Sequence, residues 1–427
     1  MYKRQIQFFL CFTILIGIHE MGHFIMARVF KIRVEKFYIF FDPWFSLFKF
    51  KRGDTEYGLG WLPLGGYVKI AGMIDESMDK EQMKQPVKPD EFRAKPAWQR
   101  LLVMVAGVMM NVLLAIVIYC AVCYTWGDSY FSNQDAKWGY NFNPTAHEMG
   151  FRDGDRFVSI DGEEIDNVMR VQNDLLITDG GRRVVVERGG EPVTLDIPFE
   201  SLLRMRQEKA YEDLFTLRLP FIVDSVSYTS AVEAGLQSGD EVVAIDDLRD
   251  ADYPRYRDYL QKHKNDKVLL TVRRDGALID SLALPVDAEG RIGVTVTNPY
   301  SLRTQYYTFW ESIPAGIHKA GKTISSYWDQ LKLIVQPKTK MYEELGGFVA
   351  IGSIFPGSWD WHDFWLKTAF LSIILAVMNL LPIPGLDGGH ALFTLWEIIT
   401  RRKPSEKFLE VAQYVGLMII LALLVYA

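Results

Sequence analysis

The sequence predicts a polytopic α-helical membrane protein with four transmembrane helices and a water-soluble α+β middle. Its 427 residues are 49% apolar, yet the mean hydropathy of +0.02 is too low for a chain that lies wholly in a bilayer. The apolar residues are concentrated towards both ends, in four segments of about the 20 residues that cross a bilayer. The middle of the chain instead carries an internal repeat.

Composition excludes several other classes of protein. An aromatic content of 13% excludes a disordered chain, and a pI near 5.8 without a basic block argues against a nucleic-acid partner. The three cysteines, Cys11, Cys120 and Cys123, all lie in apolar segments. The CxxC spacing of the last two is found in redox and metal sites, but apolar neighbours favour inert buried thiols.

The first predicted span lies within residues 1–29. Lys3 and Arg4 precede its apolar run, as in a secretory signal, but no small-residue cleavage site follows, so we expect a retained span. His19, Glu20 and His23 form an HExxH sequence inside it. On a helix both imidazoles lie on one face and can reach one Zn²⁺, while Glu20 could accept a proton from water.

Ionisable side chains inside an apolar span are costly and are usually functional. The alternative is that these three residues only tie helices together through buried polar contacts. Residues 30–97 follow as a cytoplasmic or membrane-associated β region, because apolar and aromatic strand-like runs occupy residues 35–72. In an exposed loop such runs would promote aggregation, and a small β subdomain used only for packing is one way to cover them.

The second span covers residues 98–126, and the repeat follows it. Eight residues recur at an offset of 85: Ala146, Glu148, Gly150, Gly154, Asp155, Val158, Ile160 and Asp161 return as Ala231, Glu233, Gly235, Gly239, Asp240, Val243, Ile245 and Asp246. Gly154 and Gly239 suit a turn with positive φ, and an alternating strand pattern follows each. Two copies are too few for a solenoid, so we expect two domains, 127–215 and 216–300.

Both copies resemble bacterial PDZ domains, in the circularly permuted form found in membrane-associated proteases. The matching segments read MGFRDGDRFVSIDG and AGLQSGDEVVAIDD. PDZ domains can bind a peptide as an added strand, so the resemblance implies two extracytoplasmic α+β domains with peptide or protein ligands. The alternative is a pair of size filters or spacers without a ligand.

Residues 301–361 are expected to contain an amphipathic helix. Apolar residues recur at helical spacing at Ile313, Ile317, Ala320, Ile324, Tyr327, Leu331 and Val335. A helix that rests on the outer membrane surface fits this pattern, and a helix that packs against the repeat fits nearly as well.

The third span, residues 362–390, contains the segment NLLPIPGLDGG, which cannot be one continuous helix. Pro382 and Pro384 interrupt the helix, and broken backbone at membrane depth must be buried in protein or line a cavity. A carboxylate there needs a cation or another partner. Because catalytic zinc needs a third protein ligand, Asp387 is the best candidate, and His390 competes with it.

A cytoplasmic loop over residues 391–407 and a fourth span over residues 408–427 complete the chain. Basic clusters follow the first span, precede the second and separate the third from the fourth, which places these three regions on the cytoplasmic side. Lys3 and Arg4 oppose this orientation but are outnumbered. We therefore expect both termini and the middle outside, with the metal site in the cytoplasmic half of the bilayer.

Together these motifs resemble the site-2 protease family of intramembrane zinc metalloproteases, in its bacterial tandem-PDZ branch. HExxH in the first span and NxxPxPxLDGG in the third are the family's two signatures, with the PDZ pair between the second and third spans. The resemblance implies Zn²⁺ held by His19, His23 and Asp387, with Glu20 as general base. It also implies the inner membrane of a bacterium.

The resemblance extends to residues that would bind substrate. Asn379 resembles the family asparagine that holds the substrate backbone, and Pro382 and Pro384 would shape the cleft. Gly107 and Asn111 resemble the family's G-x-x-x-N on the second span, although the proline common after that glycine is replaced by valine.

The strand-like runs over residues 35–72 resemble the family's membrane-associated β-hairpin region, and Gly66, Tyr67 and Val68 fall in its Gly-Tyr-Val-Lys segment. An exposed strand edge there could pair with an unwound substrate helix, because a helix shields its peptide bonds until it is unwound. The resemblance implies hydrolysis within single-span membrane proteins that an outer protease has already shortened, such as anti-sigma factors or leftover signal peptides.

Two rival functions remain at the level of sequence. The first is a non-enzymatic membrane receptor with a vestigial metal site, against which the intact motifs argue. The second is a metal transporter, which would need further polar residues along a path, and the second and fourth spans offer few.

Overall fold

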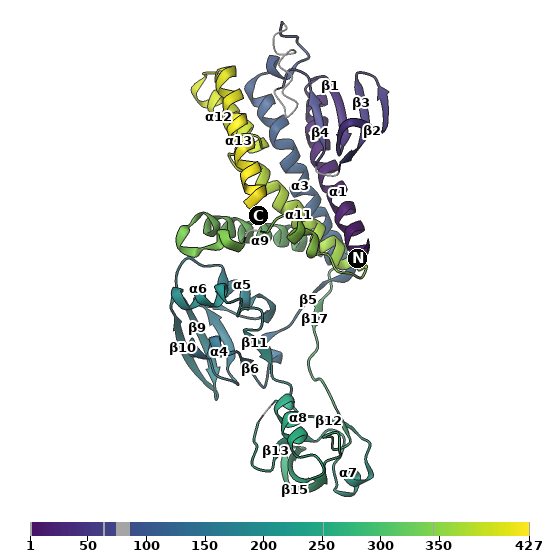
Figure 1. Ribbon diagram of the computed structural model, residues 1–427, viewed down its shortest axis with the longest axis vertical. Coiled ribbons are helices and arrows are strands. Elements are labelled where there is room, and N and C mark those ends of the chain that lie inside the picture. Colours follow the sequence, from purple (N-terminus) through teal and green to yellow (C-terminus); the bar gives the residue numbers. More distant parts are fainter. Residues whose placement is uncertain (1, 63–64, 74–85, 251, 345, 427) are drawn as a thin grey trace. The chain divides into compact units, whose positions relative to one another are not determined.

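The computed structural model describes residues 2–62, 65–73, 86–250, 252–344 and 346–426 (Figure 1). The chain forms two compact units. The first unit comprises Met1–Asp128 and Tyr306–Ala427, and the second comprises Ser129–Gln305.

The first unit is built from long apolar helices. Its helices are α1 (Tyr2–Val29), α3 (Ala97–Trp126), α9 (Phe309–Val335), α10 (Phe348–Ser353), α11 (Trp361–Leu380), α12 (Asp387–Thr400) and α13 (Glu406–Tyr426), with 3-10 turns η1 (Phe92–Ala94), η4 (Pro337–Thr339) and η5 (Met341–Glu344). Among the described residues, α1, α3 and α11 are long and apolar enough to cross a membrane. The segment expected as a fourth span is helical in α13, and its crossing stays a prediction.

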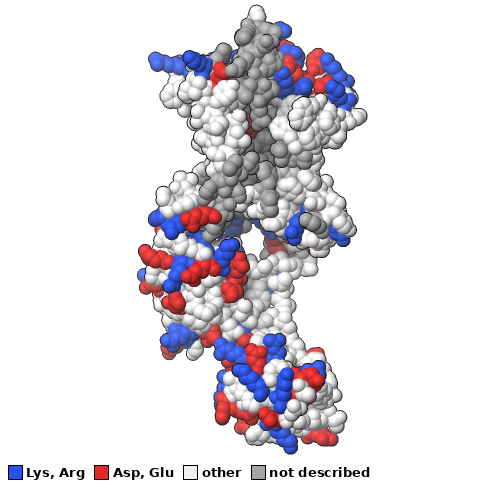
Figure 2. All heavy atoms as spheres, in the orientation of Figure 1, with Lys and Arg blue, Asp and Glu red and all other residues white. Residues whose placement is uncertain are grey.

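Helix α3 is the centre of this unit, because it packs against α1, α9, α11 and α12 (Figure 1). On its outward face Met109, Leu113 and Val117 are more than half exposed, as expected for side chains that face lipid. On the face seen in Figure 2, charged side chains gather at the two ends of the first unit, and the described atoms of the belt between them are almost free of charge. These features fit a membrane protein.

A four-stranded sheet follows α1, in the order β2-β3-β1-β4. Its strands are β1 (Val34–Ile39), β2 (Phe41–Arg52), β3 (Thr55–Leu62) and β4 (Tyr67–Ile70). β2 and β3 form an antiparallel hairpin that turns at Gly53, where φ is +64°, and β4 pairs antiparallel with β1 at the opposite edge. The strands expected over residues 35–72 are therefore present.

The predicted amphipathic helix is α9, and its small residues pack against α3. A Cβ at Gly316 would lie 2.5 Å from the backbone nitrogen of Cys120, and Ile313 O accepts a contact from the Cys120 thiol at 3.6 Å. Within the first unit α9 also contacts α11. The helix therefore packs on the apolar helices α3 and α11, partners that its sequence pattern did not identify. Cys120 and Cys123 are free thiols.

Helical structure continues beyond the end of the third predicted span. α11 ends at Leu380, the backbone is irregular to Leu386, and helix resumes as α12 from Asp387 to Thr400. Residues 391–400, expected as part of the cytoplasmic loop 391–407, are therefore helical. The reason is that α12 carries an apolar face, including the buried Ala391, which packs against α3.

The second unit is α+β and has two hydrophobic cores. The first core is centred on Tyr140, Phe157 and Val186, and the second on Phe221, Tyr256 and Val268.

The elements of the first half are β5 (Asp128–Tyr130), η2 (Asn133–Asp135), β6 (Tyr140–Phe142), α4 (Pro144–Glu148), β7 (Arg156–Ile160), β8 (Glu163–Glu164), η3 (Val168–Arg170), α5 (Val171–Leu176), β9 (Arg182–Arg188), β10 (Glu191–Ile197), α6 (Phe199–Gln207) and β11 (Phe215–Leu217). Those of the second half are β12 (Val223–Val226), α7 (Thr229–Glu233), β13 (Glu241–Ile245), α8 (Tyr253–Lys262), β14 (Lys267–Arg274), β15 (Ala277–Pro285), β16 (Val294–Val296) and β17 (Arg303–Gln305).

The sequence repeat is also a structural repeat. Gly154 and Gly239 have φ values of +96° and +89°, as their turns require. The aspartate after each glycine is almost fully buried and receives both a backbone N–H and an arginine: Asp155 pairs with Arg188 and Asp240 with Arg274. The same pair of contacts therefore recurs around the repeated aspartate in each half. The identification of these halves as PDZ domains stays a prediction.

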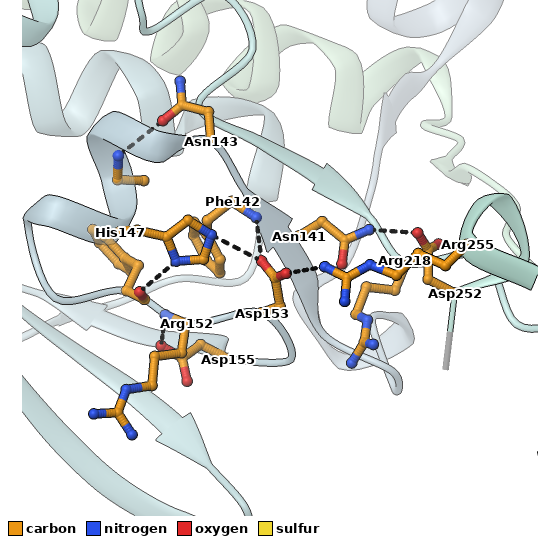
Figure 3. Close-up of polar contacts among 12 residues, drawn as sticks. Asn141, Phe142, Asn143, His147, Arg152, Asp153, Asp155, Arg218, Asp252 and Arg255 are labelled. Carbon is orange, nitrogen blue, oxygen red and sulfur yellow. Dashed lines mark hydrogen bonds and ion pairs between the residues drawn. The ribbon is translucent and has the colours of Figure 1, made fainter. Parts of the chain in front are cut away.

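Polar contacts join the two halves of the second unit (Figure 3). Asn141 Nδ2 donates to Asp252 at 2.7 Å. The Asp153 carboxylate forms an ion pair with Arg255 and also contacts the ring of His147. Because the Asn141–Asp252 and Asp153–Arg255 contacts cross between the two halves, the halves hold each other as one unit.

Candidate metal centre

Helix α1 places two histidines on its buried face. His19 and His23 are separated by one turn and are only 7% and 8% exposed, although they lie in an otherwise apolar helix. Their Nε2 atoms are 3.2 Å apart. Two lone pairs therefore point into the same small volume, as the HExxH spacing predicted.

Asp387 reaches the same volume from the start of α12. The interruption predicted at Pro382 and Pro384 is present, and Gly385 has φ of +101°, which lets the chain turn before the helix restarts. Two following glycines permit this turn, since a Cβ at Gly388 or Gly389 would lie 2.3 or 2.5 Å from the carbonyl oxygen of Leu381 or Ile383, respectively. The carboxylate sits at the positive end of the α12 dipole.

The three side chains lie close enough together to hold one metal ion. Asp387 Oδ2 lies 3.0 Å from His19 Nε2 and 3.2 Å from His23 Nε2. Ligands about 2.0 Å from a tetrahedral zinc are separated by about 3.3 Å, which these distances approach. Although buried, Asp387 Oδ2 has no hydrogen-bond partner within the described structure. A buried oxygen without a donor, facing two imidazole nitrogens, fits a bound cation.

Helix α3 fixes the orientation of both imidazoles. His23 Nδ1 donates to the Val103 carbonyl at 2.8 Å, which leaves its Nε2 free to bind a metal. The Asn111 amide lies 3.3 Å from His19 Nδ1, and its Oδ1 is buried without another partner. When the amide is turned so that Oδ1 accepts from His19 Nδ1–H, His19 has the same tautomer as His23. Gly107 leaves room for both rings, because a Cβ there would lie 2.4 Å from His23 Nε2.

Glu20 lies between this cluster and the edge of the sheet. The N–H of Val68 in β4 is directed at its carboxylate, and a Cβ at Gly66 would be 3.4 Å from Glu20 Cγ. The side chain of Tyr67 turns away and donates from its hydroxyl to Asp42 at 2.9 Å. The backbone of this segment, rather than its side chains, therefore borders the site. β4 is an edge strand, so one of its sides has no strand partner within the described sheet.

The remaining predicted residues lie on two sides of the cluster. Asn379 Nδ2 is 3.4 Å from His19 Nε2, so its amide borders the metal site. Pro382 and Pro384 form the irregular backbone between α11 and α12, and Pro384 O lies against Gly416 of α13. His390 does not join the ligand set and instead lines a cavity with Met104 and Thr394.

Sequence reasoning missed the Val103 carbonyl and a long-range ion pair between Arg100 and Glu397. A backbone carbonyl leaves no mark in the sequence. The two charges stand in or beside predicted spans, where an ionisable side chain is a signal of function, but their pairing spans 297 residues.

The matches to known proteins cover nearly the whole chain. The sequence model described as peptidase family M50 matches residues 7–423. A protein of Clostridium perfringens provisionally named a zinc metalloprotease is 29% identical over 97% of this chain and 94% of its own length. The regulator of sigma E protease of Haemophilus influenzae is 27% identical over 98% of this chain and 96% of its own. A Vibrio cholerae protein, also provisionally named a zinc metalloprotease, is 29% identical over 99% of this chain and 96% of its own length.

Proposed function

The chain belongs to peptidase family M50 and is a metalloprotease, and from this we propose that it cuts peptide bonds within the transmembrane segments of single-span membrane proteins. The observation that carries the proposal is the position of the ligand set. His19 and His23 lie in α1, a helix apolar enough to cross a membrane. Asp387 follows the irregular backbone at the end of α11, a second helix of this kind. A hydrolytic site at this depth acts on chains that reach it through the membrane.

Three residues would hold the metal and a fourth would move protons. His19, His23 and Asp387 supply two neutral nitrogens and one carboxylate, a donor set that suits Zn²⁺ and leaves a position open. Zn²⁺ bound there would polarise the scissile carbonyl and lower the pKa of water. Glu20 would accept a proton from the attacking water and deliver it to the leaving amine.

The edge of β4 would hold the substrate in extended form. A transmembrane helix satisfies its own backbone, so its peptide bonds are inaccessible until it unwinds. The backbone of Gly66, Tyr67 and Val68 borders Glu20 and could pair with the unwound segment by strand addition. The Asn379 amide, 3.4 Å from His19 Nε2, would donate to a substrate carbonyl.

The proposed location is the inner membrane of a bacterium. Basic clusters next to the spans support an orientation with the β region on the cytoplasmic side and the second unit and both termini outside. The second unit would exclude proteins with bulky outer domains or bind peptide ligands through PDZ-like grooves. The named activity of the Haemophilus influenzae relative supports an anti-sigma factor as substrate, and leftover signal peptides form the other class.

The test is cleavage of candidate single-span proteins by the purified protein in detergent. We expect cleavage that a zinc chelator abolishes and added Zn²⁺ restores. Glu20→Gln should lower the rate by at least ~100-fold, because the general base is lost, while stoichiometric zinc stays bound. Cleavage that survives both the chelator and Glu20→Gln would exclude this function, and zinc content measured on the same samples is the control for folding.

A further inference from the structure

Arg100 and Glu397 form a buried ion pair that connects α3 to α12. Arg100 Nη2 donates to Glu397 Oε1 at 2.5 Å, and the two side chains are only 10% and 19% exposed. Arg100 Nε donates to the Lys95 carbonyl at 3.2 Å, and its guanidinium lies 6.0 Å from the centre of the Phe92 ring. The arginine is thus held in place on α3 before it meets the glutamate.

Neither charge stabilises its own helix. Arg100 stands in the first turn of α3 and Glu397 in the last turn of α12, and each is opposed by the dipole of its helix. Burial adds a desolvation cost, so such a pair is seldom explained by stability alone. Its best-attested use is to fix one arrangement of packed elements.

The arrangement fixed here concerns the metal ligands. α12 begins at Asp387, so Glu397 is ten residues further on, about 15 Å along the same helix. Before α12, the chain from Leu381 to Leu386 is irregular. α3 already orients His23 through the Val103 carbonyl. Contacts to α3 therefore determine where both ends of the ligand set lie.

We propose that Arg100 and Glu397 are positioning residues for the metal centre: their ion pair sets the height and rotation of α12 on α3, and so holds Asp387 Oδ2 beside the two imidazoles. The inference rests on the metal centre of the proposed function and is independent of the substrate. It also predicts that zinc affinity depends on the attraction between residues 100 and 397, whichever of the two carries the positive charge.

The structure allows a clean test of the pair. A cavity of about 80 Å³, lined by both residues together with Met104 and His390, can admit water when a charge is removed. Glu397→Gln keeps the shape of the side chain, and Arg100→Gln removes the other charge. In the exchanged double variant, Arg100→Glu with Glu397→Arg, each charge faces the favourable end of its helix dipole.

The experiment measures zinc affinity of the full-length protein in detergent by competition with a chromogenic chelator. We expect each single variant to bind zinc about 10- to 100-fold more weakly, and the exchanged double variant to recover most of that loss. Cleavage by the Glu397→Gln variant should rise towards the wild-type rate at saturating zinc, unlike cleavage by Glu20→Gln. The matched control is Asp363→Asn, which breaks the Asp363–Lys367 pair within α11 and should leave zinc affinity unchanged.

Zinc affinity of Glu397→Gln within twofold of wild type would overturn the inference. So would a folded exchanged variant that binds zinc as weakly as the single variants, and this second comparison decides the matter if a single variant fails to fold. Zinc binding that responds to the pair, without cleavage of any single-span protein, would instead refute the proposed substrate and keep the positioning role.

Discussion

Asn111 shows how one side chain can set the chemistry of another. Its amide lies in the buried interior of α3, 0% exposed, next to His19 Nδ1. An imidazole that binds a metal through Nε2 carries its proton on Nδ1, and this proton needs an acceptor when water is excluded. Asn111 Oδ1, which is otherwise without a partner, can supply that acceptor.

Asn111→Leu is therefore expected to weaken zinc binding about 10- to 100-fold with little change in shape. Chelator competition on the purified protein measures the effect. Gln7→Leu is a matched control, because buried Gln7 donates to the carbonyls of Pro356 and Ser358, far from the metal ligands in sequence and function. It should lower thermal stability and spare zinc affinity. Equal zinc affinities for wild type and Asn111→Leu would show that His19 needs no such acceptor.

At the scale of elements, the site depends on how closely α1 approaches α3. Gly22 and Gly107 make the approach possible, since a Cβ at Gly22 would be 2.5 Å from Ala106 O and one at Gly107 would meet both imidazoles. Small residues let membrane helices pack with their backbones in contact. The same contact puts Val103 O and Asn111 within reach of the histidines.

Gly107→Ala should therefore separate α1 from α3 and reduce zinc affinity by at least ~10-fold, with a stability loss of about 1–3 kcal/mol from overpacking. Thermal unfolding and zinc content check both effects. Gly17→Ala on α1 is the control, because its nearest neighbour would be Ile39 Cδ1 at 3.9 Å, and helix propensity favours alanine by about 1 kcal/mol. Wild-type zinc content in Gly107→Ala would contradict the close-packing argument.

At the scale of the whole molecule, the candidate metal ligands and the sequence repeat lie in different units. All three ligands lie in the first unit, and the chain leaves for and returns from the second unit through the paired strands β5 and β17. Ser129 Oγ is 2.9 Å from Thr304 Oγ1, so the two crossing points are adjacent. A short linker can therefore replace the second unit without moving the ends of the first unit apart.

Replacing Ser129–Gln305 with a short Gly/Ser linker should leave zinc binding intact. We expect the preference for shortened over uncut substrates to fall about tenfold, or ~1.4 kcal/mol in relative transition-state free energy. Competitive cleavage of a shortened and an uncut single-span protein measures this ratio. The same linker inserted at Gly276, an open hairpin turn, is the control. Unchanged discrimination would mean that the second unit does not filter substrates, and loss of zinc would mean that the units are not independent.

Local patterns were enough to predict much of this protein. The histidine spacing depends only on helix geometry, the break near Asp387 on the two prolines, and the repeat on matching residues, so each could be read along the chain. The membership of a zinc metalloprotease family, predicted from these motifs, is confirmed by the match over residues 7–423. The segment expected as a cytoplasmic loop over residues 391–407 is helical as far as Thr400, because an apolar face that packs on α3 extends α12.

By itself, then, the sequence predicted the candidate ligands and determined their helical register and the place where the third span is interrupted. Only the tertiary structure decided that Asp387 lies 3.0 Å from His19, that the Val103 carbonyl orients His23, and that Arg100 meets Glu397. The physical reason is that spacing along a helix is set by backbone geometry, whereas contacts between residues hundreds of positions apart depend on how whole helices pack. A backbone carbonyl or an interhelical ion pair acquires its role only when that packing brings its partner within reach.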